Sequence, residues 1–293
     1  MTTKPFIIAA VGALSVMPAT AQKDITPQML QQFQNSYKSE GADKALDNAV
    51  AANDIKVLAL NNETMAQFDT EFSNKVNSKG VTNQRGSGRC WLFSGLNVLR
   101  AKMIAKYNLG AMEFSENYCF FYDQLEKSNL FLQAVIDNGK KPMDDRTVDW
   151  LFHNPLSDGG TFCGVADVVS KYGLVPSTVM PETFSSNSTG TYSMLLKTEL
   201  REYGLTLRKM IADGKSDKQV VAKKVEMLGV VYKMLVRCFG VPPQKFSYTL
   251  RNAAGKVIIS KEYTPKSFYD EHIGIDLTDN YFMFMNDPSR DYY

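Results

Sequence analysis

The chain changes character abruptly at residue 89, and no other feature of its sequence restricts the possible folds as much. Residues 81–88 are polar and contain glycine, which predicts a loop. The apolar residues that follow fall on more than one side of a helix: Leu92, Phe93, Leu96, Val98, Leu99, Met103 and Ile104. A helix that is apolar around most of its circumference is buried in a core. We therefore predict a buried helix over residues 89–107, closed by the turn at residues 108–110.

A cysteine stands at the junction between this loop and the predicted helix. The N-terminus of a helix favours the thiolate form of a cysteine, through the helix dipole and the unpaired backbone N–H groups. Acyl transfer also needs hydrogen-bond donors aimed at the oxyanion that develops. The backbone N–H of Cys90 can supply one donor, and the side-chain amide of Gln84, six residues earlier, can supply a second. The segment thus has the composition of a thiol-based acyl-transfer site.

The rest of the sequence predicts helices first and strands later. Thr26-Pro27 is typical of a helix start, and Leu30, Phe33 and Tyr37 recur on one face that we expect to be packed. Residues 53–80 are predicted to cross the surface without a regular element, and the polar residues 185–190 to form a boundary. Further helices are predicted at residues 42–52, 115–126, 165–172, 193–213 and 217–239, the last two as a helical hairpin.

After residue 243 the pattern becomes that of strands. Phe246, Tyr248 and Leu250 alternate, residues 252–255 supply a turn, and residues 257–260 return. A short helix is predicted after Thr264-Pro265, followed by another apolar run at residues 281–285. Few strands cannot bury their own face, so we expect this sheet to be incomplete.

The segment Gln-x5-Cys-Trp that runs into an apolar helix resembles the active-site segment of the papain superfamily. The details are most similar to the bleomycin hydrolase and bacterial aminopeptidase C family, over roughly residues 26–290. The stretches that carry the resemblance, in chain order, are Val81-Thr82-Asn83-Gln84, Ser87-Gly88-Arg89-Cys90-Trp91-Leu92-Phe93, Leu96-Asn97-Val98, Phe114-Ser115-Glu116-Asn117-Tyr118, Asn154-Pro155, Asp158-Gly159-Gly160, Lys171-Tyr172-Gly173-Leu174-Val175-Pro176, Phe268-Tyr269, Glu271-His272 and Asn286-Asp287-Pro288.

The resemblance implies an α+β, papain-like fold and a thiol peptidase that releases residues from the free N-terminus of peptide substrates. It makes Cys90 the nucleophile, Gln84 the oxyanion-hole amide, and Gly159 and Gly160 a backbone ledge that pairs with the substrate main chain. For the two glycines a plain turn is the alternative. The resemblance also implies a homo-oligomer, a hexamer, to which the predicted helical hairpin is a candidate contributor.

The sequence pattern and the resemblance together predict four segments along the chain. We expect a signal peptide at 1–21, the helical nucleophile domain at 22–190, the helical hairpin insertion at 191–243, and the start of a β-barrel domain at 244–293. The catalytic histidine and asparagine of the family lie on the barrel half, beyond these residues. His153 and His272 are the only histidines, and neither falls at the expected place.

We therefore expect a C-terminally truncated chain that is catalytically incompetent alone. The alternative is a non-catalytic pseudo-peptidase that acts as a scaffold for oligomerisation or binding. The retained pair of Gln84 and Cys90 favours the truncated enzyme, because a non-catalytic lineage has no reason to keep both.

The remaining cysteines, Cys119, Cys163 and Cys238, fall on apolar helical faces and are predicted core residues. The wide spacing of the four cysteines does not indicate a disulfide framework. No Cys/His pair has the spacing of a zinc site, so no structural metal is predicted, and no cofactor is implied.

Charge and the N-terminal segment bear on partners and location. A formal net charge of +2 gives no support to nucleic-acid binding. Residues 6–17 are mostly apolar but too short to span a bilayer, and Ala19-Thr20-Ala21 fits a cleavage site, so export to the periplasm or medium is predicted. No later stretch looks transmembrane. The resemblance also implies where a disulfide is missing: Ser87 and Ser157 stand where secreted papain-like enzymes usually have two bridged cysteines. The bleomycin hydrolase branch lacks this bridge as well and is typically intracellular. A cytoplasmic location is therefore the alternative.

Overall fold

The computed structural model describes residues 24–38, 40–67, 69 and 71–281. The chain divides into two compact units, Met1–Ser73 and Asn74–Tyr293. The predicted signal peptide, residues 1–21, lies outside the described residues, and so does nearly all of the predicted apolar run at 281–285. The domain boundaries expected from the resemblance stay predictions.

The described part of the first unit consists of short helices. Thr26 caps the first of them as predicted, because its side chain accepts a hydrogen bond from the backbone of Met29. The expectation that this helix packs one face is wrong within the unit, where none of its residues is buried. Helical spacing creates an apolar face but does not supply the surface that covers it. The helices are α1 (Pro27–Ser36), α2 (Ala42–Ala52), α3 (Ile55–Leu58) and α4 (Asn62–Ala66), the last two inside the segment predicted to be irregular.

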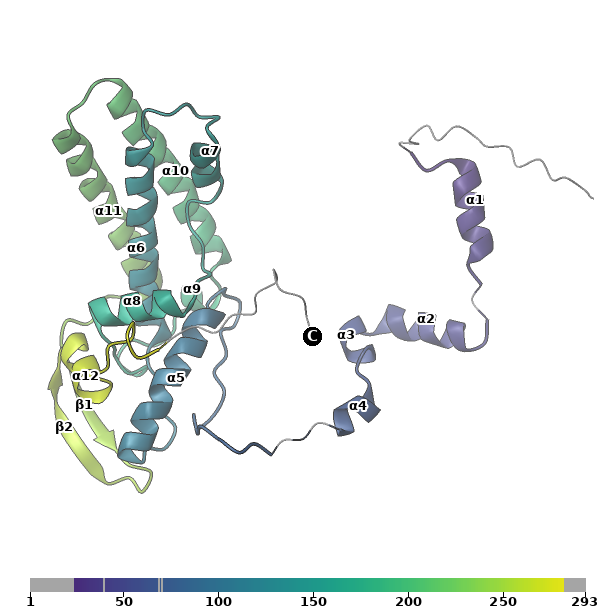
Figure 1. The fold of residues 1–293 in the computed structure, drawn as a ribbon, viewed down its shortest axis with the longest axis horizontal. Coiled ribbons are helices and arrows are strands. Elements are labelled where there is room, and N and C mark those ends of the chain that lie inside the picture. The colour runs from purple at the N-terminus through teal and green to yellow at the C-terminus, as the bar shows by residue number, and fades with distance from the viewer. Residues whose placement is uncertain (1–23, 39, 68, 70, 282–293) are drawn as a thin grey trace, which may run out of the picture. The chain divides into compact units, whose positions relative to one another are not determined.

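The second unit contains the core, and Figure 1 shows its helices and its small sheet. Its elements are α5 (Cys90–Tyr107), α6 (Glu116–Asp137), α7 (Arg146–His153), α8 (Phe162–Tyr172), α9 (Phe184–Asn187), α10 (Gly190–Ala212), α11 (Asp217–Phe239), β1 (Phe246–Arg251), β2 (Val257–Tyr263) and α12 (Pro265–His272). Among the described residues, no helix combines the length and the apolar character needed to cross a membrane.

Helix α5 is the buried helix that the sequence predicts. More than half of its residues are buried, and an exposed stripe runs along the remaining face through Cys90, Ser94, Val98 and Lys102. It ends at Asn108, whose left-handed backbone (φ 47°) turns the chain away. Gly95 allows α8 to approach closely, because a Cβ at this position would lie 2.6 Å from a methyl carbon of Val165. This contact fixes the first half of α5 against α8.

Helices α6, α10 and α11 lie side by side in one layer (Figure 1) and contact one another in pairs. The predicted helical hairpin is confirmed as α10 and α11. Helix α6 starts at the predicted cap, Ser115, but continues well past residue 126 to Asp137. The predicted polar boundary at 185–190 overlaps the short helix α9. A capping box between Thr183 and Ser186 stabilises the start of this helix.

The predicted β-hairpin is also confirmed. Strands β1 and β2 pair antiparallel with Phe246 opposite Tyr263, so the second strand is longer than the pattern suggested. Its turn is tied to the end of α5, since the N–H of Ala253 donates to the carbonyl of Asn108 (2.8 Å). Helix α12 follows and packs on α8 and β2. This group of elements therefore anchors the C-terminal end of α5, at the opposite end from Cys90.

Candidate functional site

Cys90 is the first residue of α5, and its thiol is exposed. The preceding residue, Arg89, occupies the N-cap position, and among the described residues no side chain caps this helix. Uncapped N–H groups at a helix N-terminus are free to bind an anion or a developing oxyanion. The position of Cys90 is thus the one predicted for a thiol nucleophile with a backbone donor beside it.

Gln84 lies in the loop before α5 and is locked to Ser87 by two reciprocal hydrogen bonds. The Gln84 side-chain Nε2 donates to the backbone carbonyl of Ser87 (2.5 Å), and the Ser87 Oγ donates to the backbone carbonyl of Gln84 (2.6 Å). An amide NH2 carries two N–H donors, so one remains for an incoming oxyanion. The loop therefore presents a side-chain donor of fixed orientation close to the start of α5.

Trp91 brings the predicted glycine ledge to the same place. Its indole N–H donates to the carbonyl of Asp158 (2.7 Å), and a Cβ on Gly160 would lie 2.7 Å from carbon atoms of the indole ring. Trp91, the residue after Cys90, thus packs directly against the turn formed by Gly159 and Gly160. The carbonyl of Gly159 already accepts a hydrogen bond from the Lys127 Nζ (2.7 Å), which leaves Gly160 as the freer edge for a substrate main chain.

The loop before α5 and the glycine turn are joined a second time. The N–H of Gly88 donates to a carboxylate oxygen of Asp158 (3.3 Å), and a Cβ at Gly88 would lie 2.9 Å from the Cβ of Asp158. Thr189 also donates to this carboxylate. A cavity of about 610 Å³ opens here, lined by Gly88, Asp158 and Gly159 on one side and by Lys197 and Arg201 of α10 among others on the other. Of the predicted site residues, Gly159 lines this cavity. The roles of Cys90, Gln84, Gly159 and Gly160 stay predictions.

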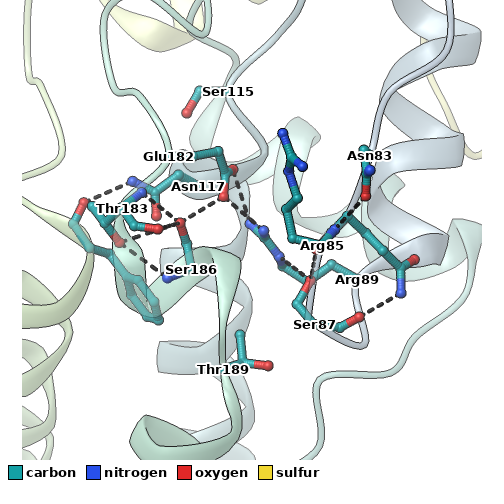
Figure 2. A network of polar contacts seen from close by, with 12 residues as sticks. Asn83, Arg85, Ser87, Arg89, Ser115, Asn117, Glu182, Thr183, Ser186 and Thr189 are labelled. Carbon is teal, nitrogen blue, oxygen red and sulfur yellow. Dashed lines mark hydrogen bonds and ion pairs between the residues drawn. The ribbon is translucent and has the colours of Figure 1, made fainter.

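Arg89 is the residue at this site that sequence reasoning missed. Its side chain is fully buried, and its guanidinium donates to both carboxylate oxygens of Glu182, at 3.0 and 2.7 Å. Figure 2 shows the guanidinium between Ser87 and Glu182. An arginine inside an apolar helix start requires a buried partner, which is a usable signal, but Glu182 lies 93 positions along the chain and could not be identified from spacing.

A second buried carboxyl group accompanies this ion pair. Burial raises the pKa of Glu116, at the start of α6, to about 8, and the negative charges of Glu182 and Glu113 act in the same direction. A backbone hydrogen bond and the positive charge of Arg89 oppose the shift. Glu116 therefore tends to be neutral near neutral pH, which leaves Glu182 as the charged partner of Arg89.

The other cysteines differ from Cys90 and from one another. Cys119 is buried, as predicted, and burial raises the pKa of its thiol. Cys238 is half-buried and packs against the core. The prediction is wrong for Cys163, which is exposed, because the buried face of α8 is formed by Val165, Ala166, Val168 and Val169 instead. All four thiols are free, and no group of three potential metal ligands occurs among residues 24–281 that the structure describes.

Neither histidine lies beside the Cys90 thiol. His272 is buried, and its two ring nitrogens contact the hydroxyl groups of Tyr107 and Tyr263, both at 3.1 Å. Tyr107 is the last residue of α5, so at 1.5 Å per residue it lies about 26 Å from Cys90. His153 is exposed at the end of α7, where its ring contacts Asp149.

The chain is similar to known proteins over most of its length. A sequence model of the Peptidase C1-like family matches residues 24–293. Aminopeptidase C of Lactobacillus delbrueckii subsp. lactis and aminopeptidase C of Lactobacillus helveticus are each 36% identical over 92% of this chain. The crystal structure of PepW from Lactobacillus rhamnosis HN001 is 37% identical, covers 88% of this chain and 58% of its own, and superposes with a TM-score of 0.79. The chain spans about 60% of the length of these curated relatives.

Proposed function

The chain belongs to the Peptidase C1-like family, with the papain-like α+β fold, and on that premise we propose that Cys90 is the nucleophile of a cysteine peptidase. The observation that carries the proposal is the exposed thiol at an uncapped helix N-terminus with the Gln84 amide fixed in the adjoining loop. A cysteine that only packs in the core needs neither an exposed thiol at a helix N-terminus nor an amide donor nearby. Cys119 shows the contrast, because it is enclosed in the core.

The reaction follows from what each group can supply. The Cys90 thiolate attacks the carbonyl carbon of the scissile bond, and the carbonyl oxygen takes up negative charge. The Cys90 N–H and the free N–H of the Gln84 amide stabilise that charge, which is the dominant contribution in many acyl-transfer enzymes. The tetrahedral intermediate expels the amine, which must receive a proton, and water then hydrolyses the thioester.

The direction of cleavage is proposed from the relatives. The proteins most similar in the comparison are named aminopeptidases, so we place the substrate's free N-terminus in the cleft and its main chain along Gly160. The exposed backbone of the glycine turn beside the nucleophile supports this placement. Gly160 rather than Gly159 carries the pairing, because Lys127 holds the Gly159 carbonyl.

The proton donor for the leaving amine is not one of the two histidines of this chain. A general acid must come within hydrogen-bond reach of the reacting group. The side chain of His272 is held at the far end of α5, and that of His153 contacts its own helix. We propose that the histidine is supplied by residues outside this sequence, and that the 293-residue polypeptide alone does not turn over substrate.

Turnover of aminoacyl p-nitroanilides tests both parts of this proposal. The 293-residue chain should release no nitroaniline above a Cys90→Ala control. A longer form of the protein that contains a histidine opposite Cys90 should release it, and Cys90→Ala should abolish the activity. Hydrolysis by the 293-residue chain that depends on Cys90 would contradict the claim about the histidine and leave the nucleophile in place. Equal activity of a longer form and its Cys90→Ala variant would reject the nucleophile and favour a non-catalytic scaffold.

Self-association of the chain is a second proposal, supported by exposed apolar side chains on α10 and α11. Met194, Leu195, Leu205, Val221 and Val225 are each between 45% and 61% exposed. Exposed apolar side chains mark interfaces in soluble proteins where they form a contiguous patch. Light scattering after size exclusion should detect a multimer, and charged substitutions at Leu195 and Val225 should shift it to a monomer. A wild-type chain that stays monomeric would contradict this.

Export of the protein is a third proposal, supported by the apolar segment at residues 6–17 and the Ala19-Thr20-Ala21 sequence. A mature N-terminus at residue 22 in a periplasmic or medium fraction would support it. Recovery of the uncut chain from the cytoplasm would contradict it.

A further inference from the structure

The most tightly bound charged side chain of the site belongs to Arg89, directly before the proposed nucleophile. It is 0% exposed and makes three hydrogen bonds, two to Glu182 and one from its Nε to the Ser87 Oγ (2.9 Å). The rings of Phe93 and Phe120 cover the guanidinium at 5.0 and 5.3 Å. A planar guanidinium held at both edges and on its faces has one orientation.

Ser87 passes this orientation on to Gln84. The Ser87 Oγ accepts from Arg89 and donates to the backbone carbonyl of Gln84, while the Ser87 carbonyl accepts from the Gln84 side chain. Three consecutive contacts thus join Glu182, Arg89, Ser87 and Gln84. Arg89 is also the N-cap residue of α5, so this array of contacts lies directly before Cys90 in the chain.

Glu182 is itself held from the other side (Figure 2). The Ser186 Oγ donates to its second carboxylate oxygen (2.6 Å). Its chain segment is fixed to the start of α6, because Asn117 donates to the Pro181 carbonyl (2.7 Å) and Ser115 donates to the Met180 carbonyl. The carboxylate therefore has a fixed position relative to the core.

From these contacts we infer that Arg89 and Glu182 are positioning residues that hold the Gln84 amide where it can bind the same oxyanion as the Cys90 N–H. This inference rests on the proposed function. A buried ion pair adds little net stability, since desolvation offsets the attraction, but it fixes geometry when its hydrogen bonds are complete. The array gains its value from the two donors at its end.

A reversible peptide aldehyde measures this spacing directly on the 293-residue chain. The thiol adds across the aldehyde carbonyl: a bond forms between sulfur and carbon, the C=O π bond breaks, and the thiol proton ends on the oxygen. The oxygen of this hemithioacetal lies where the oxyanion would lie. The dissociation constant of a ¹³C-labelled aminoacyl aldehyde, followed by NMR, therefore reports the oxyanion donors and does not require the absent histidine.

Variants separate positioning from charge. Glu182→Gln and Gln84→Ala should each weaken aldehyde binding about tenfold. Arg89→Lys keeps the charge but loses the two-pronged contact, so it should weaken binding as much as Glu182→Gln does. The double variant Gln84→Ala/Glu182→Gln should bind as weakly as Gln84→Ala alone, because the ion pair acts through Gln84 and the two changes then do not add.

Glu262→Gln is the matched control. Glu262 pairs with Lys245 at 3.1 Å on the β1–β2 hairpin, which is tied to the end of α5 away from Cys90. It should leave aldehyde binding within twofold of the wild type. If Glu182→Gln fails to fold, as judged by circular dichroism, Ser87→Ala removes the same link without stranding a carboxyl group, and should weaken binding in the wild type but not in the Gln84→Ala background.

The outcomes distinguish the inference from the proposed function. Additive losses in the double variant, or a wild-type dissociation constant in Glu182→Gln or Ser87→Ala, would overturn the inference while binding still depends on Cys90. Binding that survives Cys90→Ala unchanged, or is absent from the wild type, would instead overturn the proposed function and with it this inference. Non-additive losses confined to the Glu182, Arg89 and Ser87 variants support the inference.

Discussion

Trp91 directly follows Cys90, the proposed nucleophile, and its indole ring packs against the turn formed by Gly159 and Gly160. Because the ring occupies the space where a side chain at position 160 would go, the residue there must lack a Cβ. The indole N–H fixes the ring by its bond to the Asp158 carbonyl. The geometry of this turn thus depends on the Trp91 ring.

Gly160→Ala should therefore be destabilising. The new methyl group would lie 2.7 Å from the ring carbons, and overpacking of this kind costs about 1–3 kcal/mol. Gly159→Ala is the control, because its nearest neighbour, the Ser157 Oγ, lies at 3.4 Å, an ordinary contact. Urea unfolding of both variants measures the difference, and equal free energies of unfolding would show that Trp91 does not restrict position 160.

The raised pKa of Glu116 predicts a loss of stability at alkaline pH. The folded state holds the proton more tightly than the unfolded chain, whose carboxyl group titrates near 4.5. The contribution to stability is therefore complete below pH 4.5 and is lost as the pH rises through about 8. Each pH unit within this window costs about 1.4 kcal/mol at most.

Glu116→Gln removes this titration, so its free energy of unfolding should fall less than that of the wild type between pH 5 and pH 9. Glu262→Gln, at an exposed carboxyl group that is not among those acting on Glu116, should follow the wild type. Identical pH profiles for Glu116→Gln and the wild type would contradict the account.

At the residue scale, the sequence predicted the positions with a local signature and missed those with a distant partner. Cys90 and Gln84 are six residues apart, one at the predicted start of a helix and the other in the loop directly before it, so both were identified from neighbouring residues. Glu182 and Asp158 each bind a group far away in the sequence: Glu182 accepts from the Arg89 guanidinium, and Asp158 accepts from the backbone N–H of Gly88. Nothing in the neighbouring residues indicates such contacts.

Helix α6 connects the site to the helical layer at the scale of elements. Its cap, Ser115, accepts from the Tyr118 N–H (3.0 Å) and donates to the Met180 carbonyl, so it serves both the helix and the segment that carries Glu182. The helix was predicted too short because its later residues are covered by α10 and α11, which follow much later in the chain. The spacing of apolar residues within α6 does not reveal which later helices pack against them.

Ser115→Ala should cost more than an ordinary cap. Loss of the cap costs about 1 kcal/mol, and a buried carbonyl left without its donor adds about 1–3 kcal/mol. Ser216→Ala, at the exposed cap of α11, should cost only about 1 kcal/mol. Comparable free energies of unfolding for the two variants would argue against the double role of Ser115.

The unit as a whole is closed at the far end of α5 by the hairpin and α12. His272 lies there, 2% exposed, and burial lowers its pKa to about 4. The family resemblance covered this end of the chain in the sequence, but it did not indicate that the histidine packs between two tyrosines. That arrangement depends on how α5, β2 and α12 meet in space.

Acidification should therefore release this end first. The folded state keeps His272 neutral, so its contribution to stability is present above about pH 6.5 and is lost as the pH falls through about 4. Hydrogen exchange at pH 4.5 should accelerate in β1, β2 and α12 before it does in α6, α10 and α11. Uniform acceleration across all of these elements would contradict the prediction.

The central claim is that Cys90 differs chemically from the protein's other exposed thiol because of where the fold places it. Cys163 is the internal control, since it too is exposed in the first turn of a helix but has no Gln84 beside it. The most direct measurement is competitive labelling of the 293-residue chain with a limiting aminoacyl chloromethyl ketone, followed by peptide mapping. The account predicts that Cys90 is modified on the order of tenfold faster than Cys163, and that Gln84→Ala removes most of the difference. Equal labelling of the two thiols, or a preference for Cys163, would contradict it.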